Sequence, residues 1–594
     1  MRWQYLVAPF LGASLKLAPT WLNIRGRLAL DRDAPASLFG APGRHHFGYV
    51  LLFACSLIAI HPVFFSGFFQ GHDLYIEFVR VAEYGHMLRA GEFPVRWGGD
   101  LEGGHGYPIY NFFPPLFMMI ASTPSIAGGW SILSAIKITL FLLTFAAGAG
   151  MYLFAREHFG SKGGLLAACL YVLAPYHFVD VFIRNAFSEF TALAIAPFVF
   201  YGLATITKDD SPKPAATIVL TVSIALFVLS HNLSVAMYTP LFLAYFTVAL
   251  MATGHWRKAG RVVLPLLAAF ALTAFYTLPL LAEIRFVQTA GLTAGKFNVL
   301  ENLLPLQLLT SMVTPLFWFL IIASAITIVI RRRDIPRPTL AVLCVFGAVL
   351  LLIVFMLTPA SRWVWSQMEF LEWIQFPWRL LSPAVFLTCF GAGSLVYVPL
   401  SNARAKNILL YGVIALGTVT LTGLSATNRG SYVSIPDHDL TPENIRDGWL
   451  QTTVLSEYLP VWVKEKPVLA VADRLTASLP NALIQQLGTS PGRYRFSVIT
   501  RAETGVTAHI FYFPGWKTYV NGQETGIRIS EQGFMQFHVP AGQSMVELRF
   551  ENTLVRAMAN GTSIAGLLWF GLMLLLAFRP FRRQTPLAAT PKPP

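Results

Sequence analysis

The sequence contains repeated apolar stretches of about 20 residues, and this feature restricts the possible folds more than any other. A helix needs about 20 mostly apolar residues to cross the hydrocarbon core of a bilayer. The sequence therefore predicts an α-helical membrane protein with twelve spans. The predicted spans are 47–66, 131–155, 163–180, 188–206, 215–231, 234–252, 262–282, 311–330, 339–358, 381–400, 408–425 and 560–578.

The basic residues between these stretches indicate which way the chain crosses the membrane. If the N-terminus lies in the cytoplasm, every cytoplasmic connection is short and basic. Cytoplasmic connections of multispan proteins are enriched in Lys and Arg. The pattern predicts a protein of the bacterial cytoplasmic membrane with both termini in the cytoplasm. The basic connections are 156–162, 208–213, 257–261, 331–333 and 404–406, together with the tail that contains Arg579, Arg582 and Arg583.

Composition excludes several other classes of protein. Hydrophobic residues make up 55% and charged residues 12% of the 594 positions, whereas soluble domains carry roughly 25% charged residues. The net charge of +14 arises largely from the basic connections, so we predict no nucleic-acid partner. All four cysteines fall within apolar stretches, which argues against a disulfide framework and leaves no zinc-ligand spacing.

The longer polar segments divide the chain into four regions. Two of these segments fall on the outer side, one after the first span and one before the last. Within the first, 114–128 is apolar but short and contains prolines, which predicts an interfacial or re-entrant piece. The predicted regions are a cytoplasmic extension (1–46), a membrane module (47–425) with an outer loop (67–130), an extracytoplasmic β-rich domain (426–558), and a last span with a basic cytoplasmic tail (559–594).

Residues 73–90 of the outer loop have the pattern of an amphipathic helix. Apolar residues recur at helical spacing, and Asp73, Glu77, Arg80 and Tyr84 share the neighbouring face. A helix of this kind is expected to lie in the plane of the membrane interface. Asp73 then stands at its start, just after the first span.

The β-rich segment shows alternating apolar and polar residues separated by turn signals. Asn521-Gly522 between two such runs predicts a two-residue hairpin turn. About eight short strands predict a small sandwich or jelly-roll-like domain. No paired carboxylates, histidine cluster or nucleophile motif occur in it, so its predicted role is binding or positioning. The clearest strands are 493–499, 506–513, 534–539 and 545–550.

Ionisable residues gather where the predicted spans reach the outer side. Such residues are costly at membrane depth and indicate function, and their common side predicts a cavity open to that side and to lipid headgroups. Each also has a structural explanation. Asp73 can cap a helix, and Asp180 can pair with Arg184 one turn away. His231 can be a polar group at a helix end, and Arg379 can reach lipid headgroups.

These features together resemble the GT-C superfamily of membrane glycosyltransferases, in which a long outer loop begins with an acidic residue. The motifs resemble more closely the bacterial membrane proteins labelled pyruvoyl-tetrahydropterin-synthase-related, over roughly residues 45–580. The sequence holds no zinc-binding histidine triad for pterin chemistry. The motifs are HDLYIEF (72–78), GGHGYPIYNFFPPL (103–116), RNAFSEFTALAIAPF (184–198), SHN (230–232), QFPWRLLSP (375–383), SEYLP (456–460) and YFPGWKTYVNGQ (512–523).

The resemblance implies transfer of a hexose or pentose from a polyprenyl-phosphate donor to an envelope glycan, lipid or protein on the extracytoplasmic face. In GT-C enzymes the acidic residue of the first outer loop is the catalytic base, and the matching position is Asp73. Arginines of later outer loops contact the donor phosphate, which implies Arg184, Arg285 or Arg379. A divalent cation is a candidate cofactor without assigned ligands, although His72 stands where many members carry a second acidic residue. Further substrate-binding candidates are His72, His105, Tyr107, Asn111, Asp180, Glu189 and His231.

Two other functions are compatible with the same sequence. A transporter for lipid-linked saccharides would require charges deep inside the spans and paired repeats, whereas the polar groups gather at one end. A non-catalytic envelope scaffold would use the β-rich domain to hold a polymer or a partner. A buried, ion-paired Asp73 far from any cavity would favour the scaffold.

Overall fold

A computed structural model describes residues 45–577, except 209–213, 306, 308, 310–312, 401, 428–429, 449–456, 468–469 and 491. The chain forms two compact units, 1–51 and 52–594. Of the first unit, the described part is the beginning of helix α3 (His45–Ala59). Most of the predicted N-terminal extension, the connection 209–213 and the basic tail lie outside the described residues.

The second unit is dominated by long apolar helices, as a multi-pass membrane protein requires. Among the described residues, eight helices are long and apolar enough to cross a membrane, and four shorter apolar helices accompany them. The predicted count of twelve spans is not confirmed. The eight are Ile132–Arg184, Phe187–Lys208, Asn232–Thr253, Trp256–Phe286, Arg337–Leu357, Pro377–Tyr397, Ala403–Ala426 and Leu554–Ala577; the shorter ones are Phe47–Ala59, Leu116–Gly128, Pro214–Val228 and Pro315–Arg331.

Helix α6 (Ile132–Val172) joins two of the predicted spans. Its residue Gly160 has a φ of 68° and a ψ of −178°, a conformation that glycine adopts at low cost. The helix is therefore kinked at the predicted basic connection 156–162 and continues on the other side. The described chain then passes through α7 (Pro175–Phe178) and a π-helical turn, η4 (Val179–Arg184).

Aromatic side chains hold the central helices together. The Phe200 ring stacks on Phe386 with centroids 4.4 Å apart, and the Phe154 ring stacks on Phe390 at 4.8 Å. These contacts join α6, α8 and α17, and such stacking adds to the stabilisation from apolar burial. The helices around them are α5 (Leu116–Gly128), α8 (Phe187–Lys208), α9 (Pro214–Val228), α10 (Asn232–Thr253), α11 (Val263–Glu283), α13 (Pro315–Arg331), α14 (Arg337–Leu357), α17 (Leu381–Ala392) and α18 (Ala403–Thr427).

Helix α4 (Leu74–Arg89) matches the predicted amphipathic helix. Phe78 on the apolar face is buried, and so are Glu77, Arg80 and Tyr84 on the polar face. The polar face meets buried partners and a cavity instead of water, because an amphipathic pattern does not distinguish water from a polar cavity within the protein. Its position in the plane of the membrane interface stays a prediction.

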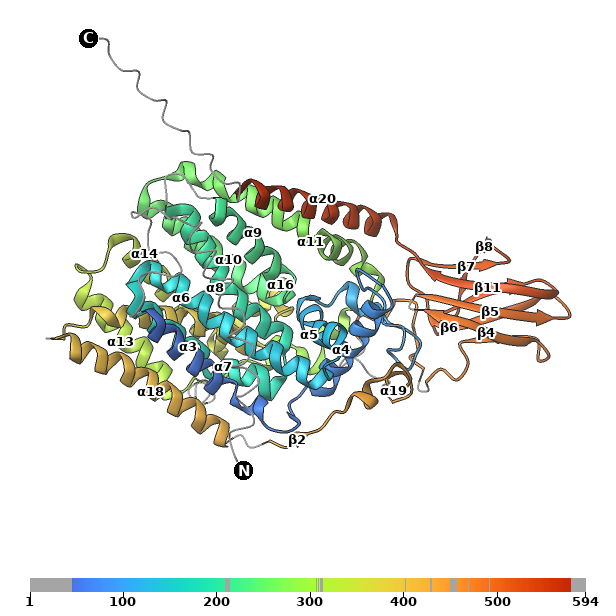
Figure 1. Cartoon of the computed structure of the whole chain (residues 1–594), viewed down its shortest axis with the longest axis horizontal. Helices are drawn as coiled ribbons and strands as arrows, with labels where there is room; N and C mark the ends of the chain where they lie inside the picture. Colours follow the sequence, from blue (N-terminus) through green and yellow to red (C-terminus); the bar gives the residue numbers. More distant parts are fainter. Residues whose placement is uncertain are drawn as a thin grey trace, which may run out of the picture. The chain divides into compact units, whose positions relative to one another are not determined.

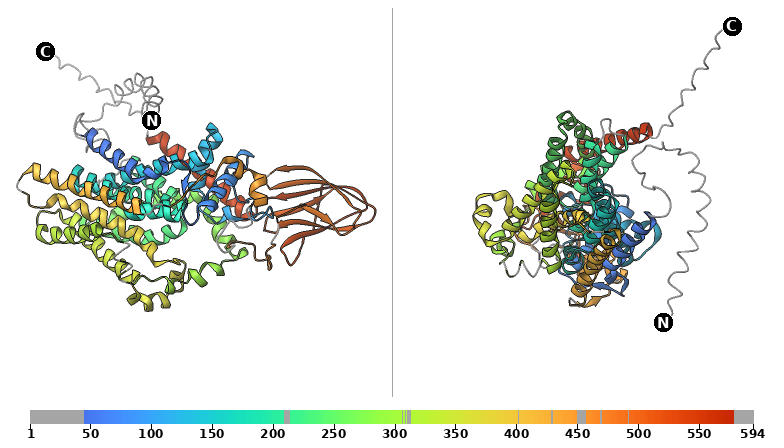
Figure 2. Two further views of the ribbon diagram at one scale, coloured as in Figure 1. Left: turned by 90° about the horizontal axis from the view of Figure 1, so that it is seen from below. Right: turned by 90° about the vertical axis from the view of Figure 1, so that its left-hand side faces the viewer.

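The C-terminal strands form two antiparallel sheets, which lie in two layers (Figure 2). One sheet has the order β3-β6-β10-β9 and the other β4-β5-β11-β7-β8. Asn521 and Gly522, with φ values of 50° and 83°, form the predicted hairpin turn between β7 and β8. The strands are β3 (Leu475–Ala477), β4 (Leu483–Ser490), β5 (Arg493–Thr500), β6 (Thr504–Phe511), β7 (Trp516–Val520), β8 (Gln523–Thr525), β9 (Arg528–Ile529), β10 (Phe534–Val539) and β11 (Gly542–Phe550).

Helix α20 (Leu554–Ala577) follows the last strand and runs beside α11 (Figure 1). The Ser563 hydroxyl donates to the carbonyl of Ala271 over 3.0 Å and accepts from the amide of Phe275 over 2.8 Å. A Cβ added at Gly566 would lie 2.9 Å from the carbonyl carbon of Ala271. The small residue therefore permits the close approach of the two helices.

Candidate functional site

A cavity of about 1340 Å³ lies where the ends of several helices meet. It is lined by residues of α4, α8, α10 and α11 and by segments near 113, 296, 375 and 457. Residues from six of the sequence motifs therefore line the same cavity, although hundreds of residues separate the motifs in the sequence. The charged residues of the lining are Asp73, Glu77, Arg80, Arg184, Glu189, Lys296, Arg379 and Glu457.

One side of the cavity is apolar. The ends of α10 and α11 contribute Leu233, Val235, Leu280 and Leu281 to the lining. The Leu281 side chain, on a membrane-spanning helix, is 72% exposed. An exposed leucine at this place puts the apolar side of the cavity next to the lipid region.

The backbone of Asp73 is fixed against the turn that carries Arg184. The amide of His72 donates to the carbonyl of Ile183 over 2.9 Å, and the amide of Asp73 donates to the carbonyl of Arg184 over 3.2 Å. A Cβ added at Gly71 would lie 2.6 Å from the Ile183 carbonyl oxygen. Only glycine therefore allows the two segments to lie this close.

The side chain of Asp73 is not used as a helix cap. Asp73 occupies the N-cap position of α4, yet its carboxylate makes no capping hydrogen bond. It is half-buried and lines the cavity. Within the described part of the chain it has no hydrogen bond or ion pair, so its oxygens are available to a ligand.

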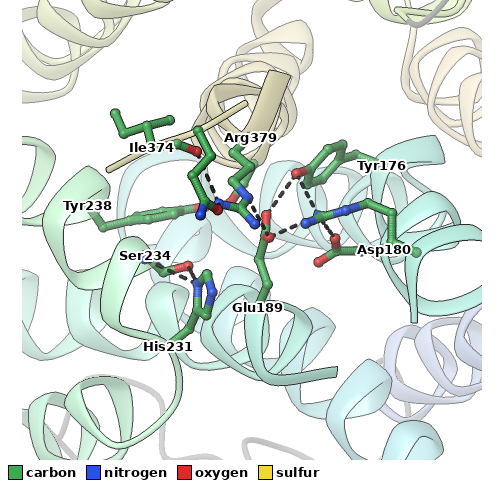
Figure 3. Close-up of polar contacts among 11 residues, drawn as sticks. Tyr176, Asp180, Glu189, His231, Ser234, Tyr238, Ile374 and Arg379 are labelled. Atoms are coloured by element: carbon green, nitrogen blue, oxygen red, sulfur yellow. Dashed lines mark hydrogen bonds and ion pairs between the residues drawn. The ribbon is translucent and has the colours of Figure 1, made fainter. Parts of the chain in front are cut away.

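Arg184 lies in a buried group of polar side chains, of which Tyr176, Asp180 and Glu189 are labelled in Figure 3. Its Nη1 contacts the carboxylate of Asp180, lies 2.9 Å from Oε2 of Glu189 and donates to the Tyr176 hydroxyl over 3.3 Å. Tyr176 in turn donates to Oε1 of Glu189 over 2.8 Å. All of these contacts within the described residues use Nη1, which leaves Nε and Nη2 of Arg184 as donors.

Arg379 approaches the same carboxylate from another segment (Figure 3). Its Nε lies 3.8 Å from Oε2 of Glu189, and its Nη1 donates to Oε1 of Gln375 over 2.6 Å and to the Ile374 carbonyl over 3.0 Å. Nη2 has no acceptor among the described residues. The preceding residue, Trp378, packs its ring against the Arg184 guanidinium at 4.5 Å.

Glu77 and Arg80 form an ion pair on the cavity wall, one turn after Asp73. The Arg80 Nη1 lies 2.9 Å from Oε1 of Glu77, and the guanidinium covers the ring of Phe113 at 4.3 Å. Burial raises the pKa of Glu77 to about 7, although the charge of Arg80 lowers it. The carboxyl group therefore titrates near neutral pH.

His231 and Asn232 connect α10 to the first outer loop. His231 caps α10 by accepting from the amide of Ser234, and its ring lines the cavity. The Asn232 side chain donates to the carbonyl of Phe112 over 3.1 Å, and the Tyr276 hydroxyl donates to the same carbonyl over 2.9 Å. His231 thus has both a structural role and a place in the cavity.

Two candidates of the first outer loop lie outside the cavity lining, at contacts with the C-terminal region. The His105 ring stacks against both Phe511 and Phe534, with its centroid 5.1 Å from each of theirs. The Tyr107 hydroxyl donates to the backbone carbonyl of Glu457. Their predicted contact with substrate is therefore not supported, because both side chains are occupied in packing.

Asn111 belongs to a second buried network outside the cavity. Its side chain donates to Oε2 of Glu283 over 2.7 Å and accepts from Arg96 over 3.0 Å. Glu283 pairs with Arg556 of α20 at 2.9 Å. This network links the first outer loop to α11 and α20, which is a structural role.

Arg285 and Asp180, two further candidates for substrate or phosphate binding, do not line the cavity. Arg285 is exposed, lies against the ring of Phe286 and does not line the cavity. Asp180 is fully buried behind Arg184 and orients it. Among the phosphate-binding candidates, the cavity therefore brings together Arg184 and Arg379.

No group of three or more potential metal-ligating side chains occurs among the described residues. His72 lines the cavity beside Asp73 but is exposed. The described residues therefore assign no ligands to the divalent cation that the resemblance implied.

Sequence reasoning assigned no role to Gln375, Glu457 or Tyr458, which also line the cavity. Each lies within a motif that was recognised in the sequence, in QFPWRLLSP or SEYLP. These two motifs were the only sequence signal for the three residues. Nothing in either motif indicates that the two segments meet at the cavity. Lys296 lines the cavity as well and lies outside every motif.

No protein-family model matches the chain, and no curated protein matches it. Among solved structures, ArnT from Cupriavidus metallidurans bound to undecaprenyl phosphate has a TM-score of 0.43 at 15% identity, over 68% of this chain and 69% of that chain. The mycobacterial arabinofuranosyltransferase AftD has a TM-score of 0.43 at 16% identity, over 66% of this chain and 27% of that chain. The oligosaccharyltransferase AglB from Archaeoglobus fulgidus has a TM-score of 0.41 at 15% identity, over 67% of this chain and 57% of that chain.

This chain thus spans 27% of the length of AftD. At TM-scores this low, a likeness shows neither a common family nor a common activity. The functional conclusion rests on the cavity.

Proposed function

We propose that this protein is a membrane glycosyltransferase that moves a sugar from a polyprenyl-phosphate donor to an acceptor hydroxyl on the extracytoplasmic face. One observation carries the proposal. The Asp73 carboxylate, without a partner among the described residues, shares a cavity with two arginines that have unused donors and with an apolar side. The sequence motifs resemble those of GT-C enzymes, which supports the same assignment.

The chemistry needs a base and a site for developing negative charge. As the acceptor oxygen bonds to the anomeric carbon, its proton passes to a carboxylate oxygen of Asp73. The bond from the anomeric carbon to the phosphate oxygen breaks, and the electron pair leaves with the polyprenyl phosphate. A single displacement of this kind inverts the anomeric centre.

The two arginines are suited to the departing phosphate. Guanidinium groups bind phosphate oxygens through paired hydrogen bonds. Glu189 and Asp180 hold one edge of Arg184, and Gln375 holds one edge of Arg379, so the other edges are oriented in advance. Preorganised donors stabilise charge in the transition state without reorganisation.

The apolar side of the cavity gives the lipid tail a place to lie. Leu280 and Leu281 are on a helix that is long and apolar enough to cross the membrane. A tail leaving the cavity past these residues would stay in hydrocarbon while the phosphate stays near the arginines. Asp73, on this proposal, faces the extracytoplasmic side.

A transfer assay with Asp73→Asn tests the proposal. Full-length protein in liposomes is given undecaprenyl-phosphate-linked glucose, galactose, mannose or arabinose, with envelope glycan fragments as acceptors. We expect transfer by the wild type and a loss of at least about 100-fold in the variant, as for removal of a general base. Donor binding, measured by protection against thermal unfolding, should persist.

Asp439→Asn is the matched control, because Asp439 is a carboxylate outside the cavity lining. It should transfer sugar like the wild type. An active Asp73→Asn variant would remove Asp73 from the mechanism. A wild type that binds glycan but transfers no sugar from any of the four donors would favour a scaffold.

A further inference from the structure

The segment that leads into the β-rich region forms part of the cavity wall. Glu457 and Tyr458, between α19 (Pro442–Gly448) and β3, both line the cavity. The proposed reaction assigns no role to either residue. They come from a different part of the chain than Asp73, Arg184 and Arg379.

This wall is held firmly by backbone pairing with the residues after α11. The amide of Tyr458 donates to the Gln288 carbonyl over 2.9 Å, and the amide of Gln288 donates to the Leu459 carbonyl over 2.8 Å. The amide of Val461 donates to the Phe286 carbonyl over 3.0 Å. The pairing fixes the direction in which the two side chains project.

Tyr458 has an unusual backbone conformation. Its φ is +70°, a left-handed value that costs a non-glycine residue roughly 1–2 kcal/mol. Its ring stacks on Phe112, with centroids 5.7 Å apart and planes 8° apart. Conformations of this kind persist where the surrounding contacts enforce them, and they cluster at functional sites.

We infer that Glu457 and Tyr458 form the acceptor subsite of the cavity and that the acceptor is a saccharide. A carboxylate accepts two hydrogen bonds at once from neighbouring hydroxyl groups, and an aromatic ring covers the apolar face of a sugar. A carboxylate would repel the donor phosphate, so this wall suits a neutral, hydroxyl-rich ligand. This inference rests on the proposed glycosyltransferase function and specifies its acceptor.

Kinetics of the full-length protein in liposomes test the inference. Glu457→Gln keeps the shape of the side chain and removes its charge. We expect the KM for an oligosaccharide acceptor to rise about tenfold, the equivalent of one charge-assisted hydrogen bond. The KM for the donor and the slow hydrolysis of the donor by water should stay unchanged.

Glu465→Gln is the matched control, because Glu465 is exposed in the same segment and does not line the cavity. Tyr458→Phe keeps the ring, and we expect its acceptor KM to stay within about threefold of the wild type. Tyr458→Ala should raise the acceptor KM as Glu457→Gln does, while donor hydrolysis shows that the site remains intact.

An unchanged acceptor KM in Glu457→Gln would overturn the inference, and so would an equal rise in the donor KM. Transfer to a peptide acceptor in preference to every oligosaccharide would overturn it as well. These outcomes leave the proposed function standing if Asp73→Asn is inactive. An active Asp73→Asn variant would instead refute the proposed mechanism itself.

Discussion

The amide of Asp73 donates a hydrogen bond to the carbonyl of Arg184 over 3.2 Å. The proposed base and a proposed phosphate-binding residue are thus held by one backbone contact, although they are far apart in the sequence. The distance between base and leaving group is then set by the backbone, which varies less than side-chain rotamers.

We predict that Gly71→Ala lowers sugar transfer by about 100-fold, because small displacements of reacting groups have costs of this size. The added methyl group would meet the Ile183 carbonyl oxygen at 2.6 Å and push Asp73 away from Arg184. Sugar transfer and membrane insertion are measured on the same preparation of the variant. Gly347→Ala is the control, since nothing lies within 4 Å of its added carbon. Normal transfer by Gly71→Ala would show that the contact does not position the base.

We predict that Arg379→Lys raises the donor KM about tenfold, through the loss of one charge-assisted hydrogen bond. Lysine keeps the charge but lacks the planar guanidinium, in which one nitrogen donates to Gln375 and another nitrogen is left for a phosphate oxygen. Titration with undecaprenyl phosphate, followed by thermal unfolding, measures the change in affinity. Arg285→Lys should leave it unchanged, because Arg285 does not line the cavity. Equal weakening by both variants would point to a general charge effect.

We predict that Glu283→Gln lowers the free energy of unfolding by about 3–5 kcal/mol, because it leaves buried Arg556 without its counter-charge. The double variant Glu283→Leu with Arg556→Met should be less destabilised than the single one, since it removes both charges. Denaturation in detergent compares the two. A double variant that is less stable than the single one would contradict this account.

We predict that Glu77 contributes stability that is lost as pH rises from about 5 to about 7. The pKa of Glu77 in the folded protein is about 7, above its ordinary value, so the folded state holds the proton more tightly than the unfolded state. The protonated form therefore contributes stability at low pH, and this is lost as pH rises through the folded pKa, on the order of 3 kcal/mol.

Glu77→Gln should flatten this dependence in thermal unfolding between pH 5 and 8.5. Burial, with a smaller contribution from Glu83, also raises the pKa of Asp100 to about 7, so part of the slope should remain. Asp100→Asn in the same background should remove most of the rest. A slope unchanged in the double variant would assign the pH dependence to other groups.

Much of the fold could be predicted from the sequence, because the patterns that indicate helices, strands and turns are local. Strand alternation predicted β5, β6, β10 and β11, and Asn521-Gly522 predicted its hairpin. The positions of α4 and of the apolar helices followed from periodicity. The twelve predicted spans are not confirmed, because four of the apolar helices in the described chain have 10–17 residues, fewer than a span needs.

The site was accessible only in part. Asp73, Arg184 and Arg379 share the cavity as the resemblance implied. His105, Tyr107 and Asn111 lie outside the cavity lining, and sequence could not show this, because a polar residue that packs against a distant segment has the same local signal as one that binds a ligand. Their partners come from the C-terminal region or from α11, and no local pattern identifies such contacts.

The backbone pairing between 286–288 and 458–461 has a consequence for how this protein can be divided. A truncated chain that ends at α19 would keep most of the helices but lose Glu457 and Tyr458. Exchange of the β-rich region with that of another protein would replace part of the cavity wall at the same time. The two parts are therefore not independent modules, and under the proposed function variation in the C-terminal region would change which acceptor the cavity takes.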